Sequence, residues 1–442
     1  MQTPIPAIID SPYHKEALER IPNEWVSWPI DKESRNANAL AKTDLPTKHW
    51  KKKMKWPRRP VVFISDPHAD AEAFEMSLIA AGVIERKGAG LQNFKLTKYG
   101  KSVEVVIGGD CLDKGPSNLD LLRSIAYLYR RKKADVTLLA GNHDLRLRMG
   151  LLAIARKKDV GNQHLFVRMG KKIVPLFKEV FEQYLDGKKW DKNVPDEATC
   201  RKRLFPNEEW FSEFPFHAAG FLTAEGIDRE VRKMQSKVEK FEQHCLAAGL
   251  TLRHVYAASM KCQALFLDKK GEFAWFFRKM ELVSKRGSFL FLHAGLDDSM
   301  GQILLKSGTK YANKAFHRNL KRKDLFGFYY SSIANTFRTK YRDADLPLTS
   351  RGVHAIHKAG IKFVVQGHVN RKHGQRVAIK KGLVHFEADI TLDTNSRIAE
   401  GLSGIGMGAT VIDKTHGVVG ISCDYPAVKV LSPKELKHIY VE

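Results

Sequence analysis

Short apolar runs alternate with amphipathic segments along much of this chain. Five runs have the length and the branched or aromatic residues typical of buried strands, at 61–65, 103–109, 136–140, 289–292 and 363–366. The first strand is expected directly after Pro60. Apolar residues at helical spacing predict helices over 69–81 and 117–133. This alternation predicts an α/β fold (α+β by some schemes) with right-handed crossovers and helices packed on a sheet.

Each of the five apolar runs ends in polar residues of the kinds that bind metal ions. The ends are Asp66-Pro67-His68, the stretch from Gly109 to Gly115 with Asp110 and Asp113, Gly141-Asn142-His143-Asp144, His293-Ala294-Gly295 and Gly367-His368. Ligands of open α/β sheets gather outside the carboxyl ends of strands, so segments spread over roughly 300 residues can converge there. Nitrogen and oxygen ligands without thiolate suit manganese, iron or zinc. We therefore predict a site for two divalent metal ions, with manganese favoured and iron or zinc as alternatives.

The order D-x-H, G-D-x-x-D-x-G, G-N-H-D, H-A-G and G-H resembles the metallophosphoesterase (calcineurin-like) superfamily. It is most similar to the phosphoprotein-phosphatase type, which includes serine/threonine phosphatases and bacterial diadenosine tetraphosphatases. In that branch a phosphate-binding arginine occurs where Arg351 lies here, and Asn370 replaces the second ligand histidine of the nuclease-like branch. The resemblance covers residues 60–149 and 286–400. It implies a four-layer α-β-β-α sandwich.

The resemblance also implies a role for each polar strand end. The residues expected to bind the first metal are Asp66, His68 and Asp110, and those expected to bind the second are Asp110, Asn142, His293 and His368. Two such metals would activate a water that attacks phosphorus directly. The expected catalytic residues are His143 as the general acid, Asp113 as its orienting partner, and Arg351 and Lys114 as phosphate ligands.

Two positions depart from the family pattern. Lys114 stands where protein phosphatases have arginine, and Asp144 replaces the common glutamate. Lysine binds phosphate as a point charge and cannot form the planar fork of a guanidinium group. The first departure weakens the case for a eukaryotic-like serine/threonine phosphatase.

The segments outside the motifs predict further domains. We expect a basic N-terminal extension (1–58), a catalytic domain in two parts (59–149 and 286–442) and a helical insertion (150–285) near the mouth of the site. Within the insertion, helices are expected over 173–184, 228–247 and 272–283. Residues 384–389, 409–413 and 417–423 predict strands of a C-terminal sheet. The basic run 48–59 with Trp50 and Trp56 is interpreted as a linker whose tryptophans pack on the core, with base stacking as the alternative.

Composition narrows the class of protein. The formal net charge is +25, which favours anionic partners, and nucleic-acid binding stays open as an alternative to a solvated basic surface. The five cysteines are widely spread and form no C-x-x-C pair, which is typical of a reducing compartment. No run approaches the length of a membrane span, and the N-terminal residues do not resemble a secretory signal, so we expect a cytoplasmic protein without a membrane partner.

The leading hypothesis is a metal-dependent phosphatase that hydrolyses a phosphate ester or anhydride of a phosphoprotein, a nucleotide or a small phosphate. A dinucleotide polyphosphate hydrolase is an alternative within the same chemistry. A nucleic-acid-directed phosphodiesterase or binding protein is an alternative from another class, and steep salt dependence of binding would support it. A binding protein with an inactive site is disfavoured because every expected ligand and His143 are present. The sequence leaves the oligomeric state open.

Overall fold

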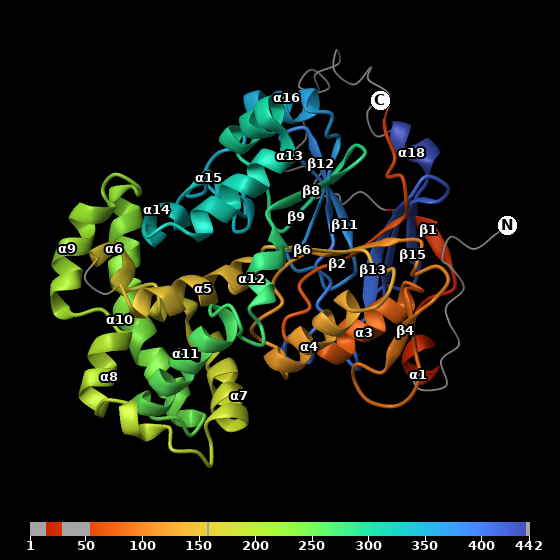
Figure 1. Cartoon of the computed structure of the whole chain (residues 1–442). Helices are drawn as coiled ribbons and strands as arrows, with labels where there is room; N and C mark the ends of the chain where they lie inside the picture. The colour runs from red at the N-terminus through yellow and green to blue at the C-terminus, as the bar shows by residue number, and fades with distance from the viewer. Residues whose placement is uncertain (1–14, 29–53, 157–158, 439–442) are drawn as a thin grey trace.

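The computed structural model describes residues 15–28, 54–156 and 159–438. Two β-sheets face each other at the centre, and helices cover their outer faces (Figure 1). In the described ranges, the larger sheet has the strand order β1-β15-β14-β13-β2-β5-β6-β7, and the smaller has the order β11-β12-β10-β9-β8. A separate hairpin is formed by β3 (Ile84–Arg86) and β4 (Phe94–Leu96). The predicted four-layer α-β-β-α architecture is confirmed.

The five predicted strands form the middle of the two sheets. The larger sheet consists of β1 (Trp25–Ser27), β2 (Val61–Ile64), β5 (Glu104–Ile107), β6 (Val136–Leu139), β7 (Met280–Glu281), β13 (Gly408–Asp413), β14 (Gly417–Ser422) and β15 (Val428–Leu431). The smaller sheet consists of β8 (Val283–Arg286), β9 (Phe289–Leu292), β10 (Phe363–Gln366), β11 (Arg376–Lys380) and β12 (Leu383–Glu387). Strands β2, β5, β6 and β7 run parallel, as do β9, β10 and β12. Their carboxyl ends therefore lie along shared edges.

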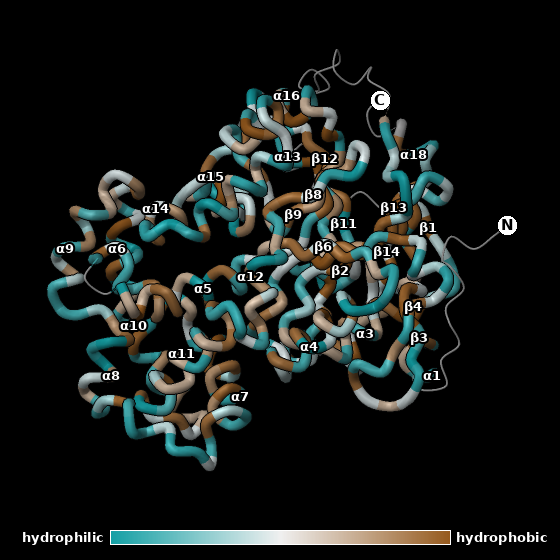
Figure 2. The backbone as a smooth tube through the Cα atoms, in the orientation of Figure 1, coloured by the Kyte–Doolittle hydropathy of each residue, from teal (hydrophilic) through white to brown (hydrophobic). Residues whose placement is uncertain are grey.

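Aromatic side chains fill the space between the two sheets. Phe63 of β2 faces Phe291 of β9 with ring centroids 5.8 Å apart, and Phe289 stacks on Phe363 at 4.8 Å. All four rings are buried. Burying a side chain of this size stabilises the fold by about 1.5–3 kcal/mol. Figure 2 shows that the hydrophobic segments concentrate in these central strands.

Capped helices cover the outer faces of the sandwich. On the larger sheet lie α3 (Ala71–Ala80) and α4 (Asn118–Tyr129), and on the smaller lie α13 (Asp298–Leu320) and α16 (Ser350–Lys358). The Asp70 carboxylate accepts a hydrogen bond from the Ala73 amide at 2.9 Å and fixes the start of α3. The predicted helices over 69–81 and 117–133 are therefore confirmed with shorter bounds. Short helices complete this part: α1 (Lys15–Leu18), α14 (Leu325–Tyr329), α15 (Ser332–Thr336), α17 (Thr394–Glu400) and α18 (Pro433–His438).

A helical segment between β6 and β7 extends to one side of the sandwich (Figure 1). It comprises α5 (Asn142–Ile154), α6 (Val160–Gln163), η2 (Val167–Met169), η3 (Lys171–Ile173), α7 (Val174–Tyr184), η4 (Asp191–Asn193), α8 (Glu197–Leu204), α9 (Glu208–Ala218), α10 (Ala224–Ala247), α11 (Leu252–Phe266) and α12 (Trp275–Lys279). The helices predicted over 173–184 and 228–247 are confirmed. The helix predicted over 272–283 is wrong beyond Lys279, because Met280 pairs with Leu138 and β7 joins the sheet beside β6.

Two predictions about the ends of the chain also need correction. The first described strand is β1, not the strand after Pro60, and it pairs in parallel with β15. The late strands do not form one C-terminal sheet. Strand β12 pairs with β10 in the smaller sheet, whereas β13, β14 and β15 extend the larger sheet. Strand propensity identified these segments but could not assign their partners, because pairing is decided by packing over long sequence separations.

The end of the basic run packs on the sandwich. Trp56 lies against Phe289 with ring centroids 5.6 Å apart, which confirms the prediction that this tryptophan packs on the core. Trp50 and residues 48–53 lie outside the described residues. Among the helices that the structure describes, none is long and apolar enough to cross a membrane.

Candidate active site

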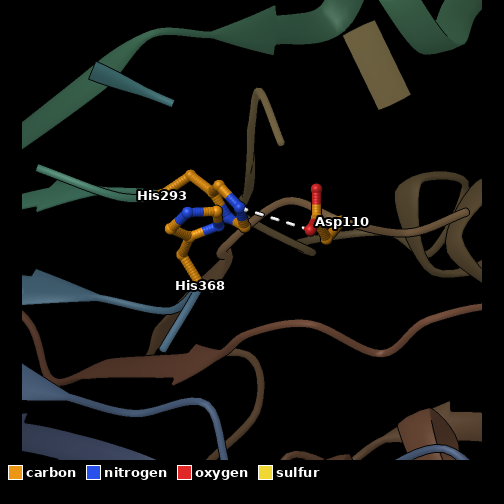
Figure 3. Close-up of side chains that lie close together, drawn as sticks. All are labelled: Asp110, His293 and His368. Carbon is orange, nitrogen blue, oxygen red and sulfur yellow. Dashed lines mark ion pairs between the residues drawn. The ribbon is translucent and has the colours of Figure 1, made fainter. Parts of the chain in front are cut away.

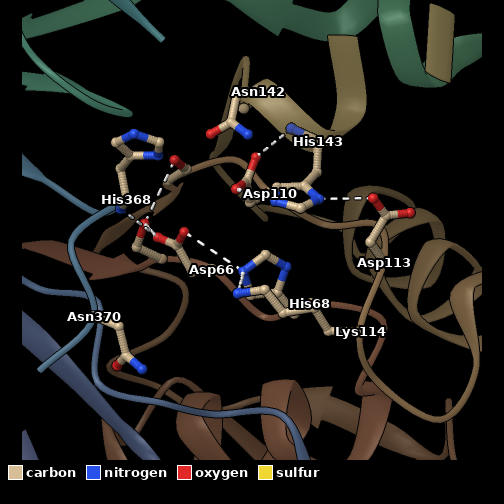
Figure 4. A network of polar contacts seen from close by, with 12 residues as sticks. Asp66, His68, Asp110, Asp113, Lys114, Asn142, His143, His368 and Asn370 are labelled. Carbon is tan, nitrogen blue, oxygen red and sulfur yellow. Dashed lines mark hydrogen bonds and ion pairs between the residues drawn. The ribbon is translucent and has the colours of Figure 1, made fainter. Parts of the chain in front are cut away.

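The carboxyl ends of five strands meet at one place and bring all six expected metal ligands together; Figure 4 labels five of them, and Figure 3 labels His293. The ligands follow β2 (Asp66 and His68), β5 (Asp110), β6 (Asn142), β9 (His293) and β10 (His368). All are buried except His368, which is partly exposed. The convergence follows from the topology, since β2, β5 and β6 are parallel neighbours in one sheet and β9 and β10 are parallel neighbours in the other.

The ligands form two groups that share one carboxylate. One group is Asp66, His68 and Asp110, and the other is Asp110, His293 and His368 (Figure 3). Within each group the ligand atoms lie within 4.8 Å of one another. The Asn142 Oδ1 atom lies 3.2 Å from His293 Nε2, which places the amide beside the second group. A carboxylate shared by two groups is the arrangement required to hold two neighbouring cations.

The orientation of the three imidazole rings fits metal binding. His68 Nδ1 donates to the Leu112 carbonyl at 3.1 Å, and His293 Nδ1 donates to the Gly108 carbonyl at 2.8 Å. His368 uses the other nitrogen and donates from Nε2 to the Arg338 carbonyl at 3.1 Å. A carbonyl oxygen can only accept, so each bond keeps a proton on that nitrogen and turns the opposite nitrogen, once it has lost its proton, toward a cation. The donor set therefore fits two divalent ions.

Burial and mutual charge shift the pKa values of these groups in different directions. Burial lowers the pKa of His293, but the carboxylates of Asp110 and Asp66 outweigh burial and raise it to about 10. Burial raises the pKa of Asp110, but His293 and His143 hold it well below its usual range. Burial, together with the charge of Lys114, lowers the pKa of His68 well below its usual value. The site thus favours a carboxylate anion at Asp110, where cations would be shared.

The backbone that carries these side chains adopts left-handed conformations. Positive φ values occur at Asp66 (55°), His68 (39°), Asp110 (52°) and His368 (66°). Such conformations cost non-glycine residues about 1–3 kcal/mol each and cluster at functional sites. At Gly367 a Cβ atom would collide with the side chains of Ser65 and Asp66, so only glycine allows β10 to end this close to β2.

The expected general acid, His143, is held by two aspartates. Its Nδ1 lies 2.6 Å from Asp113 Oδ2, and its backbone amide donates to Asp110 Oδ1 at 2.8 Å. The remaining ring nitrogen, Nε2, lies 3.9 Å from Asp110 Oδ2 and so faces the ligand groups. The Asp113 carboxylate is therefore in a position to orient the imidazole, which is the role expected of it.

Helix α7 supports this pair from behind. The Asp113 amide donates to Asn118 Oδ1 at 2.9 Å. The amide and side chain of Asn118 both donate to Glu179 Oε1 at 2.9 Å, and the Leu119 amide donates to Glu179 Oε2 at 3.0 Å. Sequence reasoning missed Glu179, because a single glutamate in an amphipathic helix carries no local sign of its partners. The helical segment thus reaches the Asp113–His143 pair through one carboxylate.

The two expected phosphate ligands differ in position. The Lys114 ammonium group donates to His68 Nε2 at 2.6 Å, so it lies within the site but on the nitrogen that a metal ion requires. A bound ion would therefore displace Lys114 and free its charge. Arg351 is exposed in the first turn of α16, and among the described residues no side-chain contact joins it to the ligands. The structure therefore offers no contact in support of Arg351 as a phosphate ligand.

Arg338, which sequence reasoning did not select, contacts one of the expected ligands through its backbone. Its carbonyl binds His368, as described above, and its guanidinium group lies over the rings of Tyr329 and Tyr330. Asp144 was noted only as a departure from the family, yet its Oδ1 accepts from the Cys111 and Leu112 amides at 2.9 and 3.1 Å. Asp144 therefore joins the end of β6 to the end of β5.

Comparisons with known proteins place the chain in a class. Residues 59–247 match the sequence model of the calcineurin-like phosphoesterase family. A search of curated proteins finds no match. Solved structures that are similar include a cold-active protein tyrosine phosphatase (TM-score 0.44, 14% identity, 86% of this chain and 80% of that chain) and a cold-active protein-tyrosine phosphatase of a psychrophilic Shewanella species (0.41, 13%, 85% and 80%). A protein serine/threonine phosphatase from Saccharomyces cerevisiae is also similar (0.35, 11%, 91% and 95%).

These structural scores are low, so the class is assigned from the family match and the fold. Residues 59–247 match a calcineurin-like phosphoesterase domain, the fold is an α-β-β-α sandwich, and Asp and His groups able to bind metal lie at its strand ends. The family match supports a hydrolase of phosphoester bonds.

Proposed function

We propose that this protein is a phosphatase of the phosphoprotein-phosphatase type. It depends on two divalent metal ions, with manganese favoured. It hydrolyses a phosphate ester or anhydride by direct attack of water on phosphorus. The observation that supports this most strongly is the sharing of Asp110 between two ligand groups beside the Asp113–His143 pair. Two ions bound there would activate water and neutralise the phosphoryl oxygens.

The residues of the chain would supply the other requirements of the reaction. His143 holds a proton at Nε2 for the leaving oxygen, while Asp113 fixes the ring through Nδ1. Lys114, displaced from His68, and Arg338, adjacent to His368, supply positive charge for the phosphoryl oxygens. Burial of the ligand residues excludes water that would screen these charges.

The contacts of Asn370 favour a monoesterase over a nuclease-like diesterase. This residue replaces the second late histidine, and its amide nitrogen donates to Glu400 Oε1 at 2.6 Å. Its side-chain oxygen accepts from the Thr391 hydroxyl. The bond to Glu400 directs the side chain toward α17, and Figure 4 shows Asn370 apart from the expected ligands. The net charge of +25 still makes nucleic acid a second candidate partner.

The test combines hydrolysis with metal analysis. Metal-stripped protein is loaded with Mn²⁺, and hydrolysis of an aryl phosphate monoester and the matching diester is measured for the wild type, His143→Gln and the control His244→Gln on α10. We expect manganese-dependent cleavage of the monoester and a fall in kcat of about 10²- to 10⁴-fold for His143→Gln. Two bound ions per chain are expected in all three proteins, by elemental analysis. A single ion in the wild type, or full activity in His143→Gln, would refute this assignment.

A further inference from the structure

Cationic side chains from four separate segments meet beside the candidate active site. They are Arg146 (α5), Arg168 (η2), Lys237 (α10) and Arg338 (after α15), and we call them the cationic cluster. Tyr329 of α14 lies among them. The guanidinium carbon of Arg168 is 4.6 Å from the centroid of the Tyr329 ring, and that of Arg338 is 5.0 Å away.

The positive charge of the cationic cluster is only partly balanced within the protein. Glu230 pairs with Arg168, with an Nη2–Oε1 distance of 3.4 Å and a closer Nη1–Oε2 contact. In the part of the chain that the structure describes, the side chains of Arg146 and Lys237 make no hydrogen bond or ion pair. The Nε atom of Arg146 is buried without a hydrogen-bond partner. One carboxylate therefore faces four cations.

The surplus positive charge of the cationic cluster lowers the pKa values of neighbouring side chains. Burial raises the pKa of Tyr329, but Arg168, Arg146 and Arg338 outweigh burial and lower it to about 7. Burial and then the charge of Arg168 lower the pKa of Lys237 to about 8. A neighbourhood that favours a phenolate and disfavours an ammonium group has a strong positive potential. An anion that binds there would gain from this potential.

The cationic cluster is continuous with the metal-ligand groups. The Arg338 carbonyl accepts the hydrogen bond from His368, while its guanidinium group faces Tyr329. Arg146 lies one helical turn beyond Asn142 and His143 on α5. An anion bound at the ligands and an anion bound at the cationic cluster would thus be neighbours.

We propose that the cationic cluster binds a second phosphoryl group of the substrate, so that the preferred substrates carry two or more linked phosphoryl groups. The inference rests on the proposed function, since it extends the same site. Guanidinium groups bind phosphoryl oxygens through paired hydrogen bonds, and a surplus of several positive charges suits a multiply charged group better than one carboxylate. Linked phosphoryl groups repeat negative charge at short separation, which matches a cationic cluster adjacent to the metal ligands.

The test compares one linked and one single phosphoryl substrate. Inorganic tripolyphosphate and an aryl monophosphate are hydrolysed with Mn²⁺ in excess over total phosphate, and the ratio of their kcat/KM values is determined. We expect this ratio to fall about tenfold in Lys237→Gln and in Arg146→Gln, because each loses a hydrogen bond to a charged group. Lys237→Arg should retain the ratio. The control Arg232→Gln removes an exposed charge from another face of α10 and should change the ratio by less than about twofold.

The outcomes separate the two proposals. A wild-type enzyme that cleaves the aryl ester, with unchanged ratios in folded Lys237→Gln and Arg146→Gln, would overturn the second phosphoryl site alone. A wild type that cleaves neither compound with two ions bound would overturn the proposed function. An equal fall of the kcat/KM ratio in Lys237→Gln and Arg232→Gln would show that any positive charge on the protein attracts the substrate. That result would also count against a specific site at the cationic cluster.

Discussion

The metal-ligand groups and the cationic cluster are adjacent but are built in opposite ways. The ligand groups use short side chains at the ends of parallel strands, on backbone held in left-handed conformations and with imidazoles fixed by carbonyl groups. The cationic cluster uses long side chains from helices and a loop, with one carboxylate among them. Short side chains on strand ends leave motifs in the sequence. Long side chains that meet from separate helices leave none.

The strongest test of the strand-end construction is Asp110→Asn. Asp110 contributes to both ligand groups, so the substitution should weaken the binding of both ions at once. Loss of a partner that only orients a ligand typically costs 10- to 100-fold in affinity, so loss of a shared ligand should cost more than about 100-fold for each ion. Elemental analysis and titration with Mn²⁺ measure this loss. Asp120→Asn, on the half-exposed start of α4, serves as the control. If Asp110→Asn retained both ions, the two ligand groups would not depend on this shared carboxylate.

Replacing Arg338 and Arg351 separately compares the arginine found in the structure with the one found in the sequence. We expect Arg338→Gln to lower kcat/KM for an aryl monophosphate by about 10²-fold, the usual cost of removing one charge-stabilising donor. Arg351→Gln should lower it by less than about twofold, since its side chain is exposed. The reverse result would restore Arg351 as the phosphate ligand and remove Arg338 from that role.

Acid unfolding tests the single carboxylate of the cationic cluster. Burial raises the pKa of Glu230, but Arg168 outweighs burial and lowers it to about 2 from an unfolded value of 4.5. A depressed pKa stabilises the fold above about pH 4.5, and this stability is lost as pH falls toward 2. By pH 3 the loss should be about 2 kcal/mol, from the shift of 1.36 kcal/mol per pH unit. Calorimetry of the wild type and Glu230→Gln between pH 6 and pH 3 should show a smaller fall in Tm for the variant, and parallel curves would contradict the pairing.

The same contrast explains what could be predicted from the sequence. The five central strands and the position of each expected metal ligand follow from apolar runs that end in Asp, Asn or His, because strand direction fixes where those ends meet. Glu179 and Arg338 could not be found, since each acts through contacts with residues far along the chain. The helix predicted over 272–283 failed for a related reason: pairing of Met280 with Leu138 overrides local helical periodicity.

The pairing of β1 with β15 has a consequence for how the molecule forms. Trp25, Val26 and Ser27 align with residues 428–430, so this contact joins segments roughly 400 residues apart. Contacts of such high sequence separation are slow to form, because the entropy of closing the loop is lost before any pairing is gained. Until β1 arrives, the β15 edge of the larger sheet exposes unpaired amide and carbonyl groups to other chains. Strand β1 therefore covers the β15 edge and prevents pairing with other chains there, and we expect it to pair late in folding.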